Sequence, residues 1–179
     1  MKAVLMSIRP EWCELIANGK KTIEVRKTRS TLQTPFKVYI YCTNGTDRLL
    51  YRDTLFDCYM TTKMKYRKNI KKNHIIGSGK VIGEFVCDRI DEYIPFEAIE
   101  IVSKYEKSIP LLKESCLTLE ELGGYIGNNN ADKNFYGWHI SDLKIYDKPK
   151  ELSEFFTPME KRPSYMIERP PQSWCYVEE

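Results

Sequence analysis

The sequence predicts an α+β fold in which a small, mixed or antiparallel β-barrel is decorated by short helices. Segments with strand periodicity recur along the chain and are mostly separated by loops, whereas few segments have helical spacing. The 179 residues, 42% of them hydrophobic, can bury one core large enough to need no disulfide or metal for stability. We therefore expect a single domain over residues 1–179, with an insertion or long excursion at about 44–78.

The N-terminal part of the chain alternates strand and helix signals. Residues 2–8 form an apolar strand candidate. A helix over residues 10–18 follows, with proline at its first turn and glycine just after its end. Residues 22–26 alternate apolar and charged side chains, and residues 37–43 are rich in β-branched and aromatic residues, so both are predicted strands.

The rest of the chain adds strands and weaker helical signals. Thr118 and Glu121 form a capping box, which predicts the start of a helix that ends near Gly123 or Gly127. A weak helical pattern also covers residues 96–102. Three more strands are predicted, over residues 79–90, 135–147 and 174–177.

Residues 44–78 differ from the rest of the chain and include a basic run. Six of the ten residues 63–72 are Lys or Arg, and Tyr66 lies among them. Lys and Arg supply phosphate contacts in nucleic-acid complexes, and an interleaved aromatic ring can stack on a base. One reading is therefore a contact with a nucleic-acid backbone and the other is a solvated loop; the residues are Lys63, Lys65, Arg67, Lys68, Lys71 and Lys72.

Composition limits the class of protein. The net charge of +3 permits nucleic-acid binding but does not require it. No apolar stretch reaches the length of a membrane span, and the N-terminal apolar run is too short for a signal peptide, so we expect a cytoplasmic protein with no membrane partner. The six cysteines are scattered without a pair at metal-ligand spacing, which predicts free thiols, no metal and no cofactor.

The segment GKKTIEVRK, residues 19–27, carries charges on one face of a predicted strand. Glu24 and Arg26 are two residues apart, so their side chains share a face and can meet the same ligand, and Lys21 lies just before them. A lysine in such a setting can act as a base or nucleophile, and a glutamate beside cations can orient a polar ligand or take a proton. The alternative is an ordinary solvated strand face.

Other residues are candidates for the same cleft. Ser7 and Arg9 join the first strand to the first helix, where backbone N–H groups favour an anion. Tyr41, on the next predicted strand, can stack on a base. Trp138 can form a pocket wall, and His139 has a side chain suited to proton transfer. The alternatives are core packing for Tyr41 and Trp138 and a structural role for His139.

The stretch SIRPEWCELIANGKKTIEVRK resembles the start of ASCH-domain proteins, whose hallmark is a GxKxxExR motif after the first helix. The motif is complete here as Gly19, Lys21, Glu24 and Arg26. The stretches VIGEFVCDRI, LTLEEL, YGWHISDLKIYDKPKELSEF and RPPQSWCYVEE look like the longer, phage- and prophage-type members of the family. The resemblance covers most of the chain, and residues 44–78 are its least typical part.

The resemblance implies a PUA-like barrel that binds RNA, a nucleotide or a modified base in a cleft lined by the motif. Some similar proteins hydrolyse a modified cytidine with a lysine, a threonine and an acid. Lys21 matches that lysine, but Glu24 stands at the threonine position and Glu114 is only an approximate counterpart of the acid. Others are described as ribonucleases, for which Lys, Glu and Arg side chains are natural acid–base and phosphate-binding groups.

Three functions follow from the sequence. The first is an RNA-, nucleotide- or modified-base-binding module with a ligand cleft at the motif. The second is a metal-independent hydrolase, a ribonuclease or a modified-nucleoside amidohydrolase, with Lys21 and Glu24 as catalytic groups. The third is a phage-encoded protein-interaction module that uses the basic run.

Overall fold

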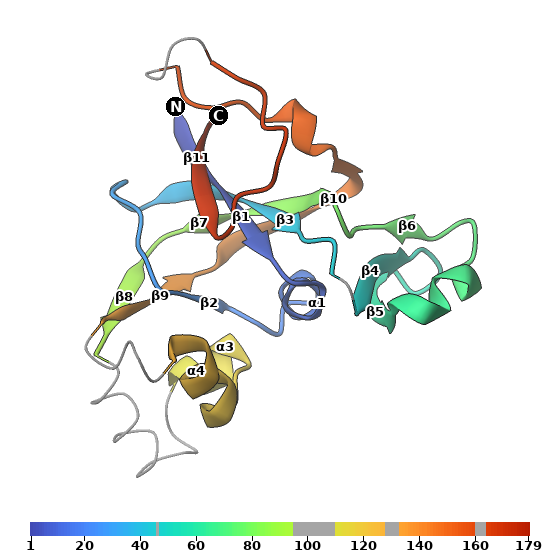
Figure 1. The fold of residues 1–179 in the computed structure, drawn as a ribbon, viewed down its shortest axis with the longest axis horizontal. Helices are drawn as coiled ribbons and strands as arrows, with labels where there is room; N and C mark the ends of the chain where they lie inside the picture. Colours follow the sequence, from blue (N-terminus) through green and yellow to red (C-terminus); the bar gives the residue numbers. More distant parts are fainter. Residues whose placement is uncertain (46, 95–109, 128–132, 160–163) are drawn as a thin grey trace.

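A computed structural model describes residues 1–45, 47–94, 110–127, 133–159 and 164–179. Within them the chain is mainly β-structure with a few short helices, so the predicted α+β class is confirmed (Figure 1). The strands form three separate sheets in the described part of the chain, and the barrel part of the prediction is not confirmed.

The largest sheet has five strands in the order β10-β7-β3-β1-β11. Only the β1–β3 pair in it is parallel. The interior strand β1 is buried on both faces, which explains its continuous apolar run. The strands are β1 (Lys2–Ile8), β3 (Phe36–Cys42), β7 (Val81–Cys87), β10 (Ser141–Lys150) and β11 (Trp174–Glu178).

Alternate side chains of β1 enter two different cores. Val4 and Met6 lie in the larger cluster, which also receives Trp138, whereas Ala3 and Leu5 pack with Tyr39 and neighbouring residues on the other face. Helix α1 (Pro10–Ala17) follows β1 and adds Cys13 and Ile16 to the larger core.

A second sheet, in the order β2-β9-β8, carries the motif strand. Its strands are β2 (Ile23–Arg26), β8 (Ile90–Tyr93) and β9 (Phe135–His139). Helices α3 (Pro110–Ser115) and α4 (Leu119–Ile126) share a third hydrophobic cluster with this sheet. Figure 1 shows the two helices beside β2 and β9.

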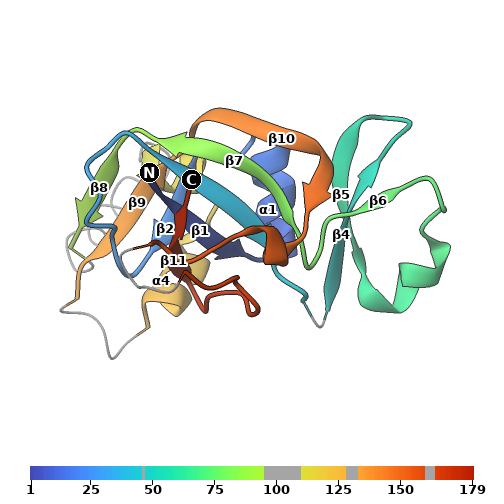
Figure 2. The same ribbon diagram turned by 90° about the horizontal axis from the view of Figure 1, so that it is seen from above.

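The third sheet, β5-β4-β6, is built entirely from residues of the predicted insertion, 44–78. It contains β4 (Arg48–Asp53), β5 (Cys58–Lys63) and β6 (Ile75–Ile76), with a 3-10 helix η1 (Met64–Asn69) between the last two. Figure 2 shows this side lobe, residues 48–76, at one end of the molecule. It docks on α1, where Thr61 donates to a Glu14 carboxylate oxygen at 2.5 Å and Asn18 donates to the Tyr59 carbonyl at 2.8 Å.

The sequence located most elements, but two predicted strands are each divided in the structure. The predicted strand over 79–90 is β7 and the beginning of β8, and the strand over 135–147 is divided at Ile140 between two sheets. The predicted Thr118 cap is confirmed, with both capping-box hydrogen bonds present. The weak helical pattern over 96–102 lies outside the described residues. A 3-10 helix, η3 (Leu152–Glu154), follows β10.

Candidate functional site

The motif residues are positioned by the exit from α1 and by the extended backbone of β2. Gly19 has a φ of +70°, a left-handed conformation that ends the helix and turns the chain toward β2. The backbone N–H groups of Lys20 and Lys21 both donate to the Leu15 carbonyl, which fixes the turn. In β2, Glu24 and Arg26 point to one face, whereas Ile23 and Val25 point to the other and pack in the cluster with α3 and α4.

The three charged side chains form one ion-paired cluster, called here the motif cluster. Glu24 lies between the two cations. Its Oε2 is 3.3 Å from Nζ of Lys21, and its Oε1 is 3.0 Å from an Nη atom of Arg26. Lys21 also donates to the Ser115 carbonyl at 2.5 Å, which ties the segment before β2 to the end of α3. The indole ring of Trp12 lies 5.2 Å from Nζ of Lys21 and provides an aromatic wall on the side of α1.

Arg26 connects the motif cluster to β1 and to the segment before β11. Its guanidinium donates to the Ser7 carbonyl at 2.7 Å and to the Ser173 hydroxyl at 3.4 Å. The Ser7 hydroxyl in turn donates to the Pro171 carbonyl at 2.6 Å. Within the described part of the chain, Nε of Arg26 is buried and has no hydrogen-bond partner.

The motif cluster is buried and carries an excess of positive charge. Lys21, Glu24 and Arg26 are 2%, 6% and 7% exposed, so the solvated-strand interpretation is wrong. The cluster brings two cations to one carboxylate, and taking charges out of water is costly unless they are paired. An anionic or electron-rich ligand beside Arg26 would complete the pairing.

Tyr125, on α4, lies where the motif cluster approaches the surface. The residue is 38% exposed, and the ammonium of Lys27 lies 5.3 Å from its ring centre. Burial raises the pKa of the Tyr125 phenol; the Arg26 and Arg9 charges oppose this shift, and the Glu24 carboxylate adds to it. Tyr125 and the exposed Arg9 therefore lie close enough to the motif cluster for their charges to interact with it.

The model of the ASCH domain family matches residues 6–126, which include the whole motif and the first strand-to-helix connection. The chain belongs to the ASCH domain family. The match does not test the phage-type subclass, which stays a prediction. No curated protein sequence matches the chain.

Solved ASCH structures have the same fold. The crystal structure of ASCH from Zymomonas mobilis has a TM-score of 0.58 and 16% sequence identity, and the match covers 99% of this chain and 88% of that chain. A serine-to-alanine mutant of that protein gives a TM-score of 0.58 at 17% identity, with 99% and 89% covered. A tyrosine-to-phenylalanine mutant gives 0.57 at 17% identity, with 100% and 92% covered. At these identities the likeness shows the fold alone.

In the ASCH domain Trp138 lies beside Glu24 on the same face of the sheet, and His139 lies on the opposite face. Trp138 is directly opposite Glu24 in the β2–β9 register, is fully buried and lies between Phe36 and Trp174. Its ring is enclosed in the hydrophobic core, so no face of the ring is exposed to a ligand. His139 lies opposite Ile23, and its Nε2 is 2.7 Å from the Asp91 carboxylate, so the structure does not bring it to the motif cluster.

Tyr41 and the basic run lie apart from the motif cluster. Tyr41 is 5% exposed and packs in the second core with Tyr39 and Val81, so its ring has no open face for stacking. The six basic residues are all exposed, on the end of β5, on η1 and on the turn after it. They belong to the side lobe, and the motif cluster contains none of them.

Sequence reasoning missed several partners of the ASCH motif. Ser115 is 94 positions from Lys21, and Ser173 is 147 positions from Arg26. Trp12 was visible only as an apolar position of α1. The single available signal was the Pro170-Pro171 pair, which marks a rigid segment before the last strand.

The described residues contain no group of three or more His, Cys, Asp or Glu side chains that could hold a metal ion. All six cysteines are free thiols. Among the described helices, none is long and apolar enough to cross a membrane.

Proposed function

We propose that this ASCH domain binds RNA, or a nucleotide or modified base, in a cleft formed by the motif cluster together with Ser7 and Arg9. The observation that carries the proposal is the buried excess of positive charge, with Nε of Arg26 unpaired. Phosphate groups and the carbonyl oxygens of bases are ligands that a guanidinium recognises well.

Each residue of the motif has a distinct part in this proposal. Arg26 donates to the ligand through Nε, while its other donors hold β1 and the segment before β11. Glu24 fixes both cations and prevents their mutual repulsion. Lys21 contributes a second positive charge to the proposed cleft. Arg9 and Tyr125 lie at the entrance of that cleft. The Tyr125 ring offers a face on which a base can stack.

The alternative is a metal-independent hydrolase that uses Lys21 and Glu24. The 3.3 Å distance between their charged groups supports this role, because proton transfer requires hydrogen-bond distance. Binding is favoured because Lys21 is ion-paired with Glu24 and donates to the Ser115 carbonyl, and Glu24 is ion-paired with both cations. Both side chains are thus engaged in holding the site together.

The side lobe would contribute contacts with the nucleic-acid backbone. One of its six exposed basic residues, Lys65, lies 4.9 Å from the centre of the Tyr66 ring. Such contacts raise affinity without reading the base sequence. The motif cluster would then determine which nucleotide is held.

Binding and turnover are measured together to test the proposal. Short RNAs and modified nucleosides are titrated with the wild type, Lys21→Met and Lys20→Met, and products are followed by mass spectrometry. Lys20 is exposed and adjacent, so its variant is a control for the same charge change. We expect Lys21→Met to weaken binding about tenfold, roughly 1.4 kcal/mol, and Lys20→Met to change it little.

Three results would lead to other conclusions. A product formed by the wild type and absent with Lys21→Met would establish the hydrolase. Equal affinity of all three proteins would contradict the proposed cleft. No binding and no product would leave the protein-interaction module, with the side lobe as its surface.

A further inference from the structure

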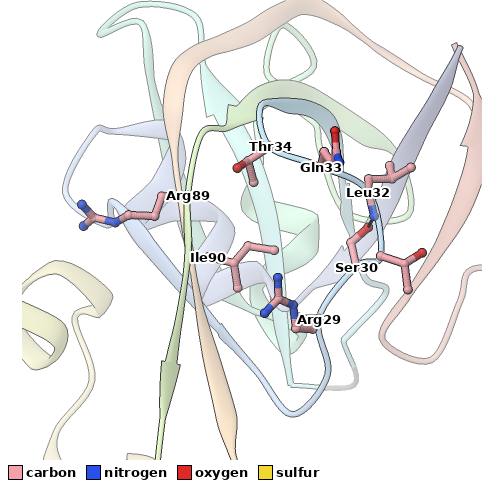
Figure 3. A pocket seen from close by; sticks show the side chains of 8 residues that line it. Arg29, Ser30, Leu32, Gln33, Thr34, Arg89 and Ile90 are labelled. Carbon is pink, nitrogen blue, oxygen red and sulfur yellow. Dashed lines mark hydrogen bonds between the residues drawn. The ribbon is translucent and has the colours of Figure 1, made fainter.

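A cavity of about 610 Å³ lies beside the end of the motif strand. One side is the loop of residues 29–34, which follows β2, and the other is Arg89 and Ile90 at the start of β8 (Figure 3). None of the motif residues lines it, so it is separate from the motif cluster.

The loop that forms this cavity is held firmly by the core. The Trp138 indole donates to the Thr28 carbonyl at 3.3 Å, and the Trp174 indole donates to the Thr28 hydroxyl at 3.0 Å. Farther along, the Tyr176 hydroxyl accepts from the backbone N–H of Thr31 at 2.9 Å and lies 3.2 Å from the Ser30 hydroxyl. These contacts to β9 and β11 pre-form one wall, which lowers the ordering cost of binding.

The cavity offers a cation, polar groups and an aliphatic surface. Arg29 and Ile90 extend toward each other in Figure 3, whereas Arg89 points away. Arg89 is ion-paired with Asp91 at 3.0 Å. Within the described residues Arg29 has no carboxylate partner, and its guanidinium lies 6.0 Å from the Tyr136 ring. This combination fits a phosphate at Arg29 and a base against the aliphatic and amide groups.

The cavity and the motif cluster are connected by a short run of cationic residues. Arg26 and Arg29 are three residues apart, so their Cα atoms are separated by at most about 11 Å. Between them lies Lys27, which is exposed and approaches Tyr125. Cations at positions 26, 27 and 29 thus lie on the stretch of chain that joins the motif cluster to the cavity, with Tyr125 beside Lys27 and Tyr136 beside Arg29.

We propose that the cavity holds a neighbouring nucleotide of the strand whose first nucleotide occupies the motif cleft. This inference rests on the proposed function and narrows its ligand class to a single-stranded oligonucleotide. A duplex does not fit, because its bases are paired and cannot enter a cavity, whereas unpaired bases can be splayed into separate pockets.

Binding of an oligonucleotide and of a mononucleotide to the same variants tests this inference. The probes are a single-stranded RNA of about eight nucleotides, its duplex and a nucleoside monophosphate, titrated against the wild type, Arg29→Gln, Lys21→Met and Lys148→Gln. Lys148 is the charge control: it is exposed on β10 near the pairing of Lys150 with Val81, at the opposite end of β7 from Arg89.

We expect Arg29→Gln to weaken binding of the single strand about tenfold and to change mononucleotide binding less than about twofold. Lys21→Met weakens both, Lys148→Gln neither, and the duplex binds the wild type more weakly than the single strand. Unchanged binding of the single strand to Arg29→Gln would overturn the inference, as would a duplex bound equally well. If Lys21→Met also binds normally, the proposed function itself fails.

Amide hydrogen exchange provides a second measurement that needs no variant. The single strand should slow exchange in residues 29–34, and an excess of the mononucleotide should not. Unaltered exchange in this loop with the single strand bound would also overturn the inference.

Discussion

Glu24 is the residue on which the buried charges of the motif cluster depend. It is the carboxylate between two cations that are less than one-tenth exposed, at 3.3 Å from Lys21 and 3.0 Å from Arg26. Removing one partner of a buried ion pair usually costs more than the pair contributes, because the remaining charge is left uncompensated. The three motif residues should therefore differ in their effect on stability.

Glu24→Gln should destabilise the fold more than Lys21→Met. Without the carboxylate, two buried cations lack compensation, and the loss is on the order of 3–5 kcal/mol. Lys21→Met leaves Glu24 paired with Arg26 and frees only the Ser115 carbonyl, so its cost is about 1–3 kcal/mol. Urea denaturation of both variants gives the two free energies of unfolding. The reverse order would show that the glutamate is not what stabilises the cluster.

Because the thiol of Cys87 is buried, we expect the protein to lose stability at alkaline pH. Burial, together with a smaller contribution from the Asp88 carboxylate, raises the pKa of its thiol from 9.0 to about 12. The thiol ionises near pH 9 in the unfolded chain, so between pH 9 and 12 the folded state binds more protons and stability falls as pH rises.

The slope from this thiol approaches about 1.4 kcal/mol per pH unit, and its contribution is fully present below pH 9. Urea denaturation of wild type and Cys87→Ala over this range should show a shallower decline in the variant. The decline that remains in the variant is expected from buried Tyr59, because burial raises the pKa of its phenol to about 12. Identical pH profiles of the two proteins would argue against the buried thiol.

The strand β7 is the element that connects β3 to β10 in the large sheet, and Gly83 marks its tightest contact. A Cβ at this position would lie 2.5 Å from the Lys144 carbonyl oxygen and 3.0 Å from the Ile145 side chain of β10. Because one contact is with backbone, it cannot be relieved by a side-chain rotation. A glycine here allows the register shift that β10 makes along β7.

Gly83→Ala should destabilise the protein by about 1–3 kcal/mol, because the two strands must separate locally. Gly123→Ala is the matched control: it lies within α4, and a Cβ there meets nothing within 4 Å. It should stabilise the protein by about 0.5–1 kcal/mol through helix propensity. Thermal unfolding of both variants measures these changes in stability. If Gly83→Ala left the stability unchanged, the β7–β10 contact would have to adjust freely.

At the scale of the whole molecule, the positive charge is concentrated in the side lobe. The ten residues 63–72 contain six Lys or Arg and no Asp or Glu, although the whole chain has a net charge of only +3. Figures 1 and 2 show this lobe extending from one end of the molecule, beyond α1. Under the proposed function, this lobe would contact the nucleic acid outside the motif cleft.

Replacing the six basic residues of the run with Gln should reduce the salt dependence of RNA binding. Each lost phosphate contact makes the slope of log K against log salt shallower by about 0.7 for a single strand. Fluorescence anisotropy at several salt concentrations measures the slope. Lys21→Met is the comparison, since it should lower affinity while changing the slope by one contact at most. An unaltered slope in the lobe variant would assign the run to a solvated surface.

The sequence by itself determined the local features of this protein. The capping box at Thr118, the glycine that ends α1 and the alternation of β2 are each encoded within a few residues, so periodicity and capping chemistry were sufficient to predict them. The motif was complete in sequence, and it identified the family that the comparison shows. The α+β class followed from the same local signals.

Only the tertiary structure decided what surrounds the motif. Ser115 and Ser173 reach Lys21 and Arg26 from 94 and 147 positions away, and no local pattern encodes such contacts. Tyr41 and Trp138 were candidate ligand contacts, but both are buried in hydrophobic clusters whose members come from distant parts of the chain. The alternation of side chains in β2 defined an apolar and a charged face but did not show which face was solvated. The fold buries both faces. The charged face is stable in the interior because Glu24 pairs with both cations.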